Sequence, residues 1–558
     1  MEAFLVDQDL EYPNLDETNI IYTNYINFVC SKKSKKLYLF NNKNKFNDEN
    51  DFSEVFFQNW YRDKESKEYF SNKISIVQIL NRLTFFSLLN DIKNFNAIKF
   101  WANKFSKITI MTESESLKRV CNYFDNVELV TNFKCKIKNN EYIPSTPERK
   151  KYFFFKKSIK RDLVSIIDKF FNLNSKKNKF LAIIDKRVNS DFLKNKDILF
   201  LNDKRFLKGF YFHKSQNYNS FDKKILTYSN YHSSLSLFKK YFNKNESEFL
   251  NKIFFNLIVN EFSKNEKLII KTINIVDKTL NFYKPKGIIL NSANDWITSI
   301  FLQLSKKYRI KIFLLLDGYN FFKSNLNIPK NIDNKEYYNF YFAYGNSFLN
   351  TLLAHKINKN KIIKVKIPQF NIKKKIKKII YDCCIVSYDP YIYNLNTTWD
   401  SKTITELKIL NVLNKLGFNK ICIKVKDSAS FIKKNSFITI NKIHELYYKI
   451  YKEKLRFDIY IETGELKYSI LKSKILIGGI STSFVESNLL DTPYYIYEPT
   501  NNGINKSKID RIHLIDKKYI LRSDKELFSN LNKKIFCKIN LSKENKGISI
   551  QNLDLNTF

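Results

Sequence analysis

The sequence is poor in glycine, proline, cysteine and arginine. Its 558 residues include 10 Gly, 9 Pro and 7 Cys, and only 11 of its 96 basic residues are Arg. So little Gly and Pro excludes a collagen-like or low-complexity chain. The odd number of Cys residues and the lack of a CxxC pair argue against a disulfide framework and against a zinc site. We therefore expect a protein of a reducing compartment that is stabilised by its apolar core.

Long apolar runs and leader-like segments are also missing. No run reaches the roughly 18 apolar residues that a membrane-spanning helix needs. The N-terminal residues MEAFLVDQDLEYP are acidic and lack the basic segment and apolar stretch of a signal peptide. None of the five His residues pairs with another at metal-ligand spacing. We predict a cytoplasmic protein that needs neither a metal nor another cofactor.

Apolar and basic residues are abundant. Hydrophobic residues make up 44% of the chain and aromatic residues 16%, which is enough for a large core and excludes wholesale disorder. The formal net charge of +41 comes mostly from Lys. Lys, Asn, Ile, Phe and Tyr are the residues of A/T-rich codons, so a coding bias explains this charge. Attraction to nucleic acid or to an anionic membrane is the alternative. Base-specific recognition is not expected, because it relies on the bidentate Arg fork.

The second half of the chain alternates between strand and helix patterns. Short apolar runs predict strands, and apolar residues at helical spacing predict helices between them. The adjacent Cys383 and Cys384 fall in the first run and are predicted to be buried. The expected strands are 382–389, 420–425, 457–464, 474–479 and 493–499, and the expected helices are 403–418, 465–473 and 481–491. This alternation predicts an α/β fold with a parallel sheet and helices on both faces.

The first half repeats the alternation less clearly. Strands are expected at 108–113, 126–130, 179–185, 284–291, 309–318, 338–345 and 362–368, with helices at 114–125, 295–308 and 347–356. We expect an N-terminal lobe over 1–370, poorly patterned over about 1–105, and a basic linker over 371–380. A C-terminal lobe over 381–530 and a tail over 531–558 follow. Glycine is concentrated from Gly287 onward, so a ligand site is expected in the second half.

A basic and aromatic stretch, RKKYFFFKKSIKR at 149–161, leads into apolar residues that share one face of a helix. This pattern predicts a helix that faces the core and exposes its lysines. The alternative is a helix on an anionic membrane surface, with Phe inserted and Lys outside.

The sequence GGISTSFVE predicts an anion site. Gly478 and Gly479 leave a strand, and Ser481, Thr482 and Ser483 open the next helix. Glycine lets a phosphate approach the backbone, and a helix N-terminus offers unpaired N–H groups and a positive dipole end. The alternative is that the hydroxyls only cap the helix. The nearby carboxylates Glu486 and Glu498 are candidates to accept hydrogen bonds from sugar or ribose hydroxyls.

Two other loops follow predicted strands. Asp317 and Gly318 end an apolar strand of the first lobe, where a carboxylate can serve as general base or simply form an Asp-Gly turn. Asp295 is a rival carboxylate that also suits a helix cap. Ser387 and Asp389 follow the first strand of the second lobe, and we expect them to line a cleft between the lobes. Ligands of open parallel sheets bind beyond the carboxyl ends of the strands.

The segment FDIYIETGELKYSILKSKILIGGISTSFVESNLLDTPYYIYEP resembles the donor-binding half of GT-B glycosyltransferases. It is similar to bacterial surface-polysaccharide enzymes, namely the capsule Kdo- and sialyl-transferases and the CDP-glycerol glycerophosphotransferases. The resemblance covers roughly residues 280–500. It implies two Rossmann-like lobes whose parallel sheets face a cleft. It also implies that Ser481, Thr482, Ser483 and Glu486 bind the phosphate and sugar of the donor.

The end of the first lobe, KPKGIILNSANDW to IIKVKIP, resembles the acceptor lobe of the same enzymes. Where those enzymes often carry a His-Gly pair with His as the proposed base, this chain has Asp317 and Gly318. Where they carry Lys-x-His-Pro, this chain has Lys424, Val425, Lys426 and Asp427. The His and Pro are absent, and Lys426 is the residue that could bind a phosphate. By this resemblance Asp317 is the catalytic base, and Ser387, Lys426, Gly478 and Gly479 join the donor site.

The resemblance implies a glycosyltransferase that acts by direct displacement and needs no divalent ion. It would move a sugar, or a polyol phosphate, from a nucleotide-activated donor to a cell-surface polysaccharide or its lipid-linked precursor. Its partners would be a nucleotide sugar, a glycan acceptor and, peripherally, the anionic inner face of the membrane. One alternative is a catalytically inactive GT-B-like scaffold, favoured by the missing His residues. The other is a basic nucleic-acid-binding protein, for which no compact motif is present.

Overall fold

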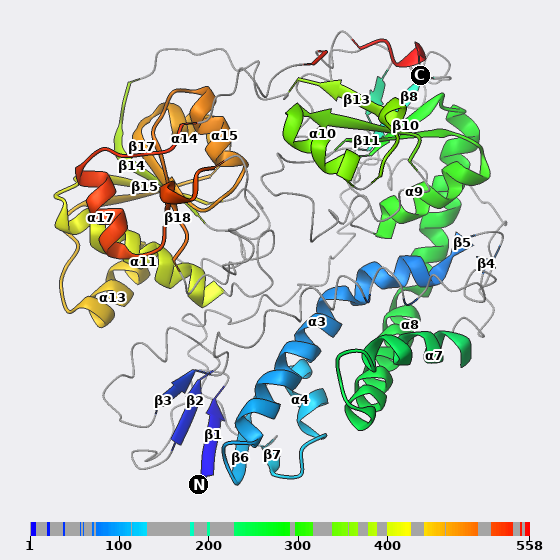
Figure 1. Cartoon of the computed structure of the whole chain (residues 1–558), viewed down its shortest axis with the longest axis horizontal. Helices are drawn as coiled ribbons and strands as arrows, with labels where there is room; N and C mark the ends of the chain where they lie inside the picture. Colours follow the sequence, from blue (N-terminus) through cyan, green and yellow to red (C-terminus); the bar gives the residue numbers. More distant parts are fainter. Residues whose placement is uncertain are drawn as a thin grey trace, which may run out of the picture. The chain divides into compact units, whose positions relative to one another are not determined.

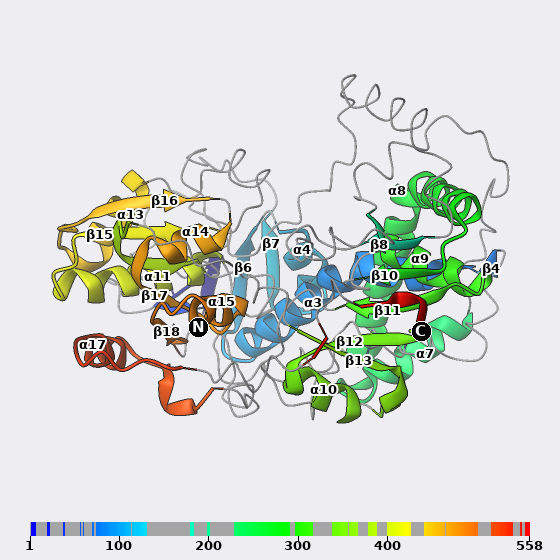
Figure 2. The ribbon, with the colours of Figure 1, turned by 90° about the horizontal axis from the view of Figure 1, so that it is seen from above.

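The structure is a computed structural model of the chain. It describes residues 2–6, 19–22, 37–39, 56, 60, 70–71, 74–112, 114–130, 179–183, 198–200, 228–290, 296–315, 338–354, 356–366, 378–387, 399–425, 440–463, 465–499, 515–538, 547–548 and 553–557. These residues form three parallel β-sheets with helices between the strands, and one short antiparallel pair. Figure 1 and Figure 2 show the elements with their labels and colours along the chain.

The chain divides into two compact units, each built from separate stretches of sequence. Unit 1 comprises Met1–Asp48, Asp91–Lys150 and Asn371–Leu541. Unit 2 comprises Glu49–Asn90, Lys151–Phe370 and Ser542–Phe558. The boundary between residues 370 and 371 coincides with the start of the expected basic linker.

The sheet formed by residues 381–521 carries the predicted anion site. Its strands are β14 (Tyr381–Val386), β15 (Lys420–Lys424), β16 (Asp458–Glu462), β17 (Ser473–Gly478), β18 (Tyr494–Tyr497) and β19 (Ile520–Leu521). Their order in the sheet is β16-β15-β14-β17-β18-β19, and all the pairs are parallel. Numbered along the chain, this is the 3-2-1-4-5-6 order of the Rossmann fold.

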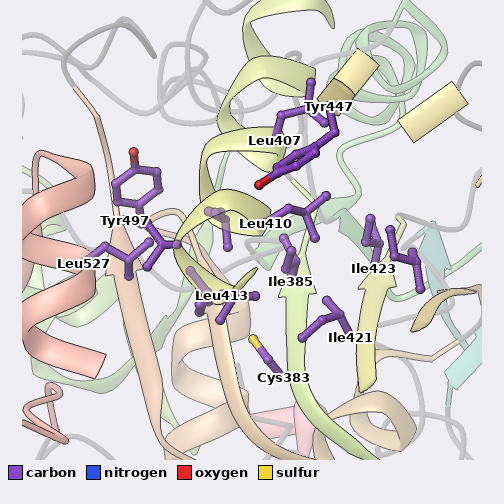
Figure 3. Close-up of a cluster of buried hydrophobic side chains, with 14 of the residues drawn as sticks. Cys383, Ile385, Leu407, Leu410, Leu413, Ile421, Ile423, Tyr447, Tyr497 and Leu527 are labelled. Carbon is purple, nitrogen blue, oxygen red and sulfur yellow. The ribbon is translucent and has the colours of Figure 1, made fainter. Parts of the chain in front are cut away.

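Helices bury both faces of this sheet, which is why its strands are almost continuously apolar. The helices are α11 (Trp399–Lys415), α13 (Ile440–Tyr451), α14 (Leu466–Leu471), α15 (Thr482–Leu489) and α17 (Asp524–Asn532). On one face α11, α13 and α17 pack over Cys383, Ile385, Ile421, Ile423 and Tyr497 (Figure 3). Alternate strand residues point to the opposite face. There Phe484 of α15 packs edge-on against Tyr494 of β18.

The sheet nearest the N-terminus has the same winding. Its strands are β1 (Glu2–Val6), β2 (Asn19–Tyr22), β3 (Leu37–Leu39), β6 (Lys107–Met111) and β7 (Val127–Val130), in the order β3-β2-β1-β6-β7. Helix α4 (Glu115–Cys121) connects β6 to β7. The long helix α3 (Ile76–Ala102) precedes β6, and Asp91 on α3 forms an ion pair with Arg119 on α4. Residues 76–90 of α3 belong to unit 2, and residues 91–102 belong to unit 1.

The third sheet belongs to unit 2. Its strands are β8 (Phe180–Ile183), β9 (Ile198–Phe200), β10 (Gly287–Leu290), β11 (Lys311–Leu315), β12 (Phe340–Tyr344) and β13 (Ile362–Val365), in the order β13-β12-β11-β10-β8-β9. The helices of this unit are α7 (Tyr228–Phe238), α8 (Lys244–Tyr283), α9 (Trp296–Lys307) and α10 (Gly345–Ala354). Shorter elements are β4 (Phe70–Ser71), β5 (Ile74–Ser75) and the 3₁₀ turn Lys359–Lys361. The turn at Lys517–Tyr519 belongs to unit 1.

Residues near the end of the sequence return to the unit 2 sheet. Ile548 forms a parallel bridge with Val365 at the outer edge of β13. A Cβ at Gly547 would lie 2.8 Å from the backbone carbon of Val365, so only glycine fits this approach. Leu553 and Leu555 are buried in the same core as Phe180 and Phe313, and Leu555 opens a 3₁₀ turn, Leu555–Thr557. Residues 547–548 thus extend the edge of the unit 2 sheet, and residues 553–557 contribute to the core of unit 2.

The predicted α/β class with parallel sheets is confirmed, as are the strands and helices expected over 381–499. Cys383 and Cys384 are buried in β14 as expected. The strands and helices expected over 108–368 are also confirmed. The strands β1, β2 and β3 and the helix α3 lie within residues 1–105, where the sequence showed no clear pattern. The stretch 149–161 and residues 371–377 of the expected linker lie outside the described residues. The arrangement of two lobes about a cleft stays a prediction. No described helix is both long enough and apolar enough to cross a membrane.

Candidate functional site

The winding of the sheet around β14 creates one place suited to a ligand. From β14 the chain moves outward through β15 and β16, and then returns to the other side of β14 with β17. In open parallel sheets the ligand crevice lies at such a switch point, beyond the carboxyl ends of the two strands. Ile385 of β14 pairs with Ile477 of β17, and continuing this register places Ser387 level with Gly479. Two of the predicted binding segments therefore leave the sheet side by side.

The turn from β17 to α15 is held from beneath by Tyr494 of β18. The Tyr494 hydroxyl donates to the carbonyl oxygen of Gly479 at 2.9 Å and lies 3.0 Å from the Ser483 hydroxyl. A Cβ at Gly478 would overlap this tyrosine hydroxyl and come 3.1 Å from the Cβ of Val386. The absence of a side chain at Gly478 thus lets the Tyr494 hydroxyl pack directly against β17 and bond to the turn that follows it.

The replacement Gly478→Ala is expected to lower the free energy of unfolding of unit 1 by about 1–3 kcal/mol, because the added methyl group displaces Tyr494 from a packed site. Differential scanning calorimetry measures the effect. Gly417→Ala is the comparison, because a Cβ there meets no atom and only its positive φ of 73° is strained. An alanine at position 478 that leaves the melting temperature unchanged would contradict the packing role of Gly478.

The first turn of α15 shows which hydroxyls are already engaged. Ser481 is the N-cap, and its Oγ accepts from the N–H of Ser483 at 3.3 Å, while its carbonyl oxygen accepts from Phe484 at 3.0 Å. The Ser483 hydroxyl is buried and contacts the hydroxyls of Ser481 and Tyr494. Thr482 is half-buried, and the described residues offer its N–H no acceptor. A bound anion would therefore meet Thr482 first, through its N–H and its hydroxyl.

Glu498 supports the same turn from the end of β18. Its side chain is 3% exposed, and its Oε1 accepts from the N–H of Ile480 at 2.7 Å. Burial raises the pKa of the Glu498 carboxyl from 4.5 to about 7, although the Ile480 N–H and the charge of Arg522 act in the opposite direction. A carboxyl with a raised pKa is ionised to a smaller extent near neutral pH, so it repels a bound phosphate less than a fully ionised carboxylate does.

Ser387 occupies the other side of the switch point. Its N–H donates to the carbonyl oxygen of Lys424 at 3.0 Å, and its hydroxyl donates to Oε1 of the buried Glu406 at 2.7 Å. Lys424 is itself 5% exposed, and its Nζ donates to the carbonyl oxygen of Val425 at 2.7 Å. These contacts fix the start of the loop that leaves β14.

The described structure brings together most of the residues expected to bind the donor. Gly478, Gly479, Ser481, Thr482, Ser483 and Glu486 lie on one strand-turn-helix segment, with Ser387 on the neighbouring strand. Asp317, Lys426, Asp295 and Asp389 lie outside the described residues, so their roles stay predictions. Sequence reasoning missed Tyr494 and Arg522, because only strand register places them next to this turn.

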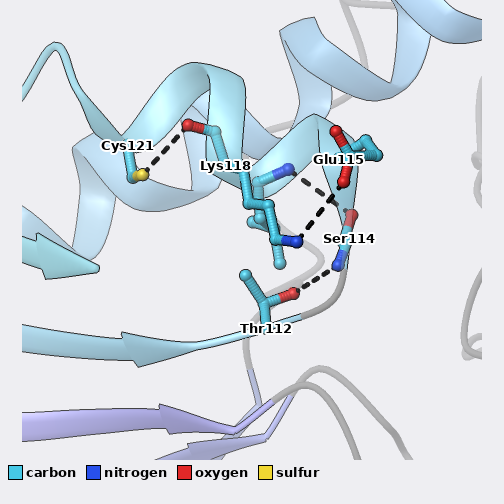
Figure 4. Close-up of polar contacts among 6 residues, drawn as sticks. Thr112, Ser114, Glu115, Lys118 and Cys121 are labelled. Carbon is cyan, nitrogen blue, oxygen red and sulfur yellow. Dashed lines mark hydrogen bonds and ion pairs between the residues drawn. The ribbon is translucent and has the colours of Figure 1, made fainter. Parts of the chain in front are cut away.

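The sheet of β1 has an equivalent switch point between β1 and β6, and its polar groups satisfy one another (Figure 4). The N–H of Ser114 donates to Thr112 Oγ1 at 2.9 Å, and Ser114 Oγ accepts from the N–H of Leu117 at 3.4 Å. Lys118 forms an ion pair with Glu115 at 3.3 Å, and the Cys121 thiol donates to the Lys118 carbonyl oxygen. Gly478 and Gly479 precede α15, whereas no glycine lies between β6 and α4, so an anion can approach the backbone more closely at the β17–α15 turn, which is the better candidate.

No protein-family model matches the chain, and no curated protein matches it. Several solved structures are similar at low identity. A UDP-N-acetylglucosamine 2-epimerase is 10% identical with a TM-score of 0.36, over 64% of this chain and 87% of that one. The Methanocaldococcus jannaschii UDP-GlcNAc 2-epimerase, solved with UDP-GlcNAc and UDP, is 15% identical with a TM-score of 0.32, over 48% and 73%. The lipopolysaccharide outer core galactosyltransferase WaaB is 13% identical with a TM-score of 0.27, over 48% and 70%. The α/β class described above rests on the chain's own sheets.

Proposed function

We propose that the chain binds a nucleotide-activated donor at the β17–α15 turn and transfers the sugar, or the polyol phosphate, of that donor to a glycan. The observation that supports this most is the position of the turn. It lies at the switch point of a sheet with Rossmann order, and it presents the Thr482 N–H at a helix N-terminus. The proposed acceptor is a cell-surface polysaccharide or its lipid-linked precursor, which follows from the sequence resemblance. The proposed location is the cytoplasm, at the inner face of the membrane.

In this proposal the residues of the turn stabilise the leaving nucleotide. Thr482 donates through its N–H and hydroxyl to the phosphate, while Ser481 and Ser483 hold the helix end in place. Glu486 accepts hydrogen bonds from hydroxyls of the donor, and Lys426 adds positive charge. Asp317 takes the proton from the acceptor hydroxyl. With a sugar donor, the acceptor oxygen bonds to the anomeric carbon, the bond from that carbon to the phosphate oxygen breaks, and the nucleotide leaves with the electron pair. With a polyol phosphate donor, the acceptor oxygen bonds to the phosphorus next to the polyol, and the P–O bond to the nucleotide breaks instead.

A thermal-shift screen against UDP, CMP, CDP, GDP and RNA, with and without Mg²⁺, tests the proposal. A ligand present at about 100 times its Kd adds roughly 2.7 kcal/mol to the folded state. Stabilisation by one nucleotide, together with release of that nucleotide from a sugar donor, supports the transferase. Stabilisation by a nucleotide without turnover of a sugar donor favours an inactive scaffold protein that still binds the nucleotide. A shift with RNA alone would make the net charge of +41 the better guide to function.

Thr482→Val is expected to weaken nucleotide binding about tenfold, because the variant keeps the shape of the side chain and loses a hydrogen bond to a charged phosphate. Isothermal titration calorimetry with the nucleotide found in the screen measures the change. Thr482→Ser is the matched control, since it keeps the hydroxyl and should bind as the wild type does. Equal affinity of the valine variant and the wild type would remove the Thr482 hydroxyl from the site.

A further inference from the structure

Arg522 carries a buried hydrogen-bond donor without an acceptor. It directly follows β19, and its backbone N–H donates to Glu526 Oε2 at 2.5 Å. Its guanidinium nitrogen Nη1 is buried, and no group among the described residues accepts from it. Buried donors are rarely left unpaired in folded proteins, so the Arg522 Nη1 donor, which has no acceptor among the described residues, is a candidate to bind a ligand.

The register of three strands places Arg522 level with the start of the β17–α15 turn, with Glu498 between them. Gly478 pairs with Ile496, and Tyr497 pairs with Leu521, so Ile480, Glu498 and Arg522 follow at one level. The N–H of Glu498 donates to the Leu521 carbonyl oxygen at 2.9 Å, and Glu498 Oε1 accepts from Ile480. Because side chains alternate along a strand, Glu498 and Arg522 lie on the face that α15 covers, opposite Tyr497 and Leu521.

Glu498 does not neutralise Arg522. Their charges are close enough to attract, yet within the described structure the two side chains form no ion pair, and the Glu498 carboxyl is turned to the Ile480 N–H. Burial lowers the pKa of the Arg522 guanidinium, with Glu498 and Glu526 acting in the opposite direction. The half-buried guanidinium therefore keeps a charge and a donor that favour an anion at this edge of the sheet.

We propose that Arg522 binds the phosphate of the ligand at the β17–α15 turn and is the cation that complements the Thr482 N–H there. This inference rests on the proposed function, because it assumes that a phosphorylated ligand occupies the turn. The planar guanidinium can donate two parallel hydrogen bonds to phosphate oxygens, which an ammonium group cannot do. On this view the unpaired Nη1 donor of the free protein is a consequence of its role in binding.

Titration calorimetry of the full chain with inorganic pyrophosphate and with UDP tests the inference. Arg522→Gln should weaken binding of both probes at least tenfold, and Arg522→Lys should recover only part of the loss. Lys525→Gln is the matched control, since it removes the same charge from an exposed residue of α17 and should leave affinity unchanged. The melting temperature of the unliganded Arg522→Gln variant should change little, because the Nη1 donor loses no hydrogen bond and only the attraction to Glu498 and Glu526 is removed.

The outcomes separate this inference from the proposed function. If Thr482→Val weakens binding and Arg522→Gln does not, Arg522 is outside the site while the proposed function stands. A lower melting temperature of unliganded Arg522→Gln, with unchanged affinity of Arg522→Lys, would make the residue structural and overturn the inference. If neither pyrophosphate nor any nucleotide binds the wild type, both the site and the role of Arg522 are wrong.

Discussion

Replacing Arg119 with methionine is expected to lower the free energy of unfolding of unit 1 by about 3–5 kcal/mol, because it leaves the carboxylate of Asp91 buried without its charged partner. Arg119 holds Asp91 through two hydrogen bonds, from Nε at 3.1 Å and from Nη2 at 2.8 Å. Asp91 is fully buried on α3, so water cannot replace the lost guanidinium. Thermal unfolding at pH 7.5 followed by circular dichroism measures the loss.

Lys118→Met on the same helix is the matched control. Lys118 pairs with Glu115, whose side chain is 76% exposed, and such surface pairs contribute about 0–1 kcal/mol. Even with Arg119 present, burial raises the pKa of Asp91 to about 6 from an ordinary 3.8. Without Arg119 the pKa rises further, so the folded state of the variant gains stability as pH falls and Asp91 takes up a proton. If the Arg119→Met variant is less stable than the wild type by the same amount at pH 5 and at pH 8, the lost stability does not come from the charge of Asp91.

Replacing Glu498 with glutamine is expected to stabilise unit 1 at high pH by up to about 3 kcal/mol. This value is the difference between the folded and unfolded pKa of Glu498, converted at about 1.36 kcal/mol per pKa unit. The pKa of this buried carboxyl is raised from 4.5 to about 7. The folded state therefore holds its proton where the unfolded state has lost it. Stability from this group is complete below pH 4.5 and falls as pH rises through 7. Glutamine keeps an oxygen that can accept a hydrogen bond from the Ile480 N–H, and it is uncharged at every pH in this range.

The measurement is the difference in melting temperature between Glu498→Gln and the wild type from pH 5 to pH 8.5. We expect almost no difference at pH 5 and a gain of several degrees at pH 8.5. Titration of Asp91 affects both proteins equally and cancels in the difference. Glu453→Gln, at an exposed position of the same unit, should show no pH-dependent difference. A glutamine variant that is less stable than the wild type at pH 8.5 would mean that Glu498 acts as an ionised partner.

The sequence predicted the strands and helices around the site well, because their signals are local. Gly417 follows helix α11, and the paired Gly478 and Gly479 lie at the end of β17. The short apolar runs of this part of the sequence match β14, β15, β17 and β18. Tertiary relations are not local and could not be predicted. That Ser483 is buried against Tyr494, while Thr482 stays accessible, depends on the register of β17 and β18. Only the pairing of β18 with β19 brings Arg522 level with Glu498.

Helix α3 shows the opposite case, in which packing overrides a weak local signal. Its sequence contains Asn81, Asn90, Asn94 and Asn96, which are poor helix formers, and it gave no clear pattern. Its buried residues Leu88, Ile92, Phe95 and Ile98 nevertheless recur at helical spacing, and Asp91 beside them binds Arg119. Tertiary burial is the main source of helix stability in proteins, so such a helix can form without strong propensity.

The return of residues 547–548 and 553–557 to unit 2 has a consequence for folding during synthesis. Leu553 and Leu555 fill the core beside Phe180 and Phe313, and Ile548 bonds the edge of β13. The ribosome makes all of residues 371–541, which belong to unit 1, between β13 and this segment. Domains usually fold in the order of their synthesis. Here unit 2, whose strands up to β13 are made before residues 371–541, has to wait with an uncovered core and an open edge at β13 until that stretch of unit 1 has emerged.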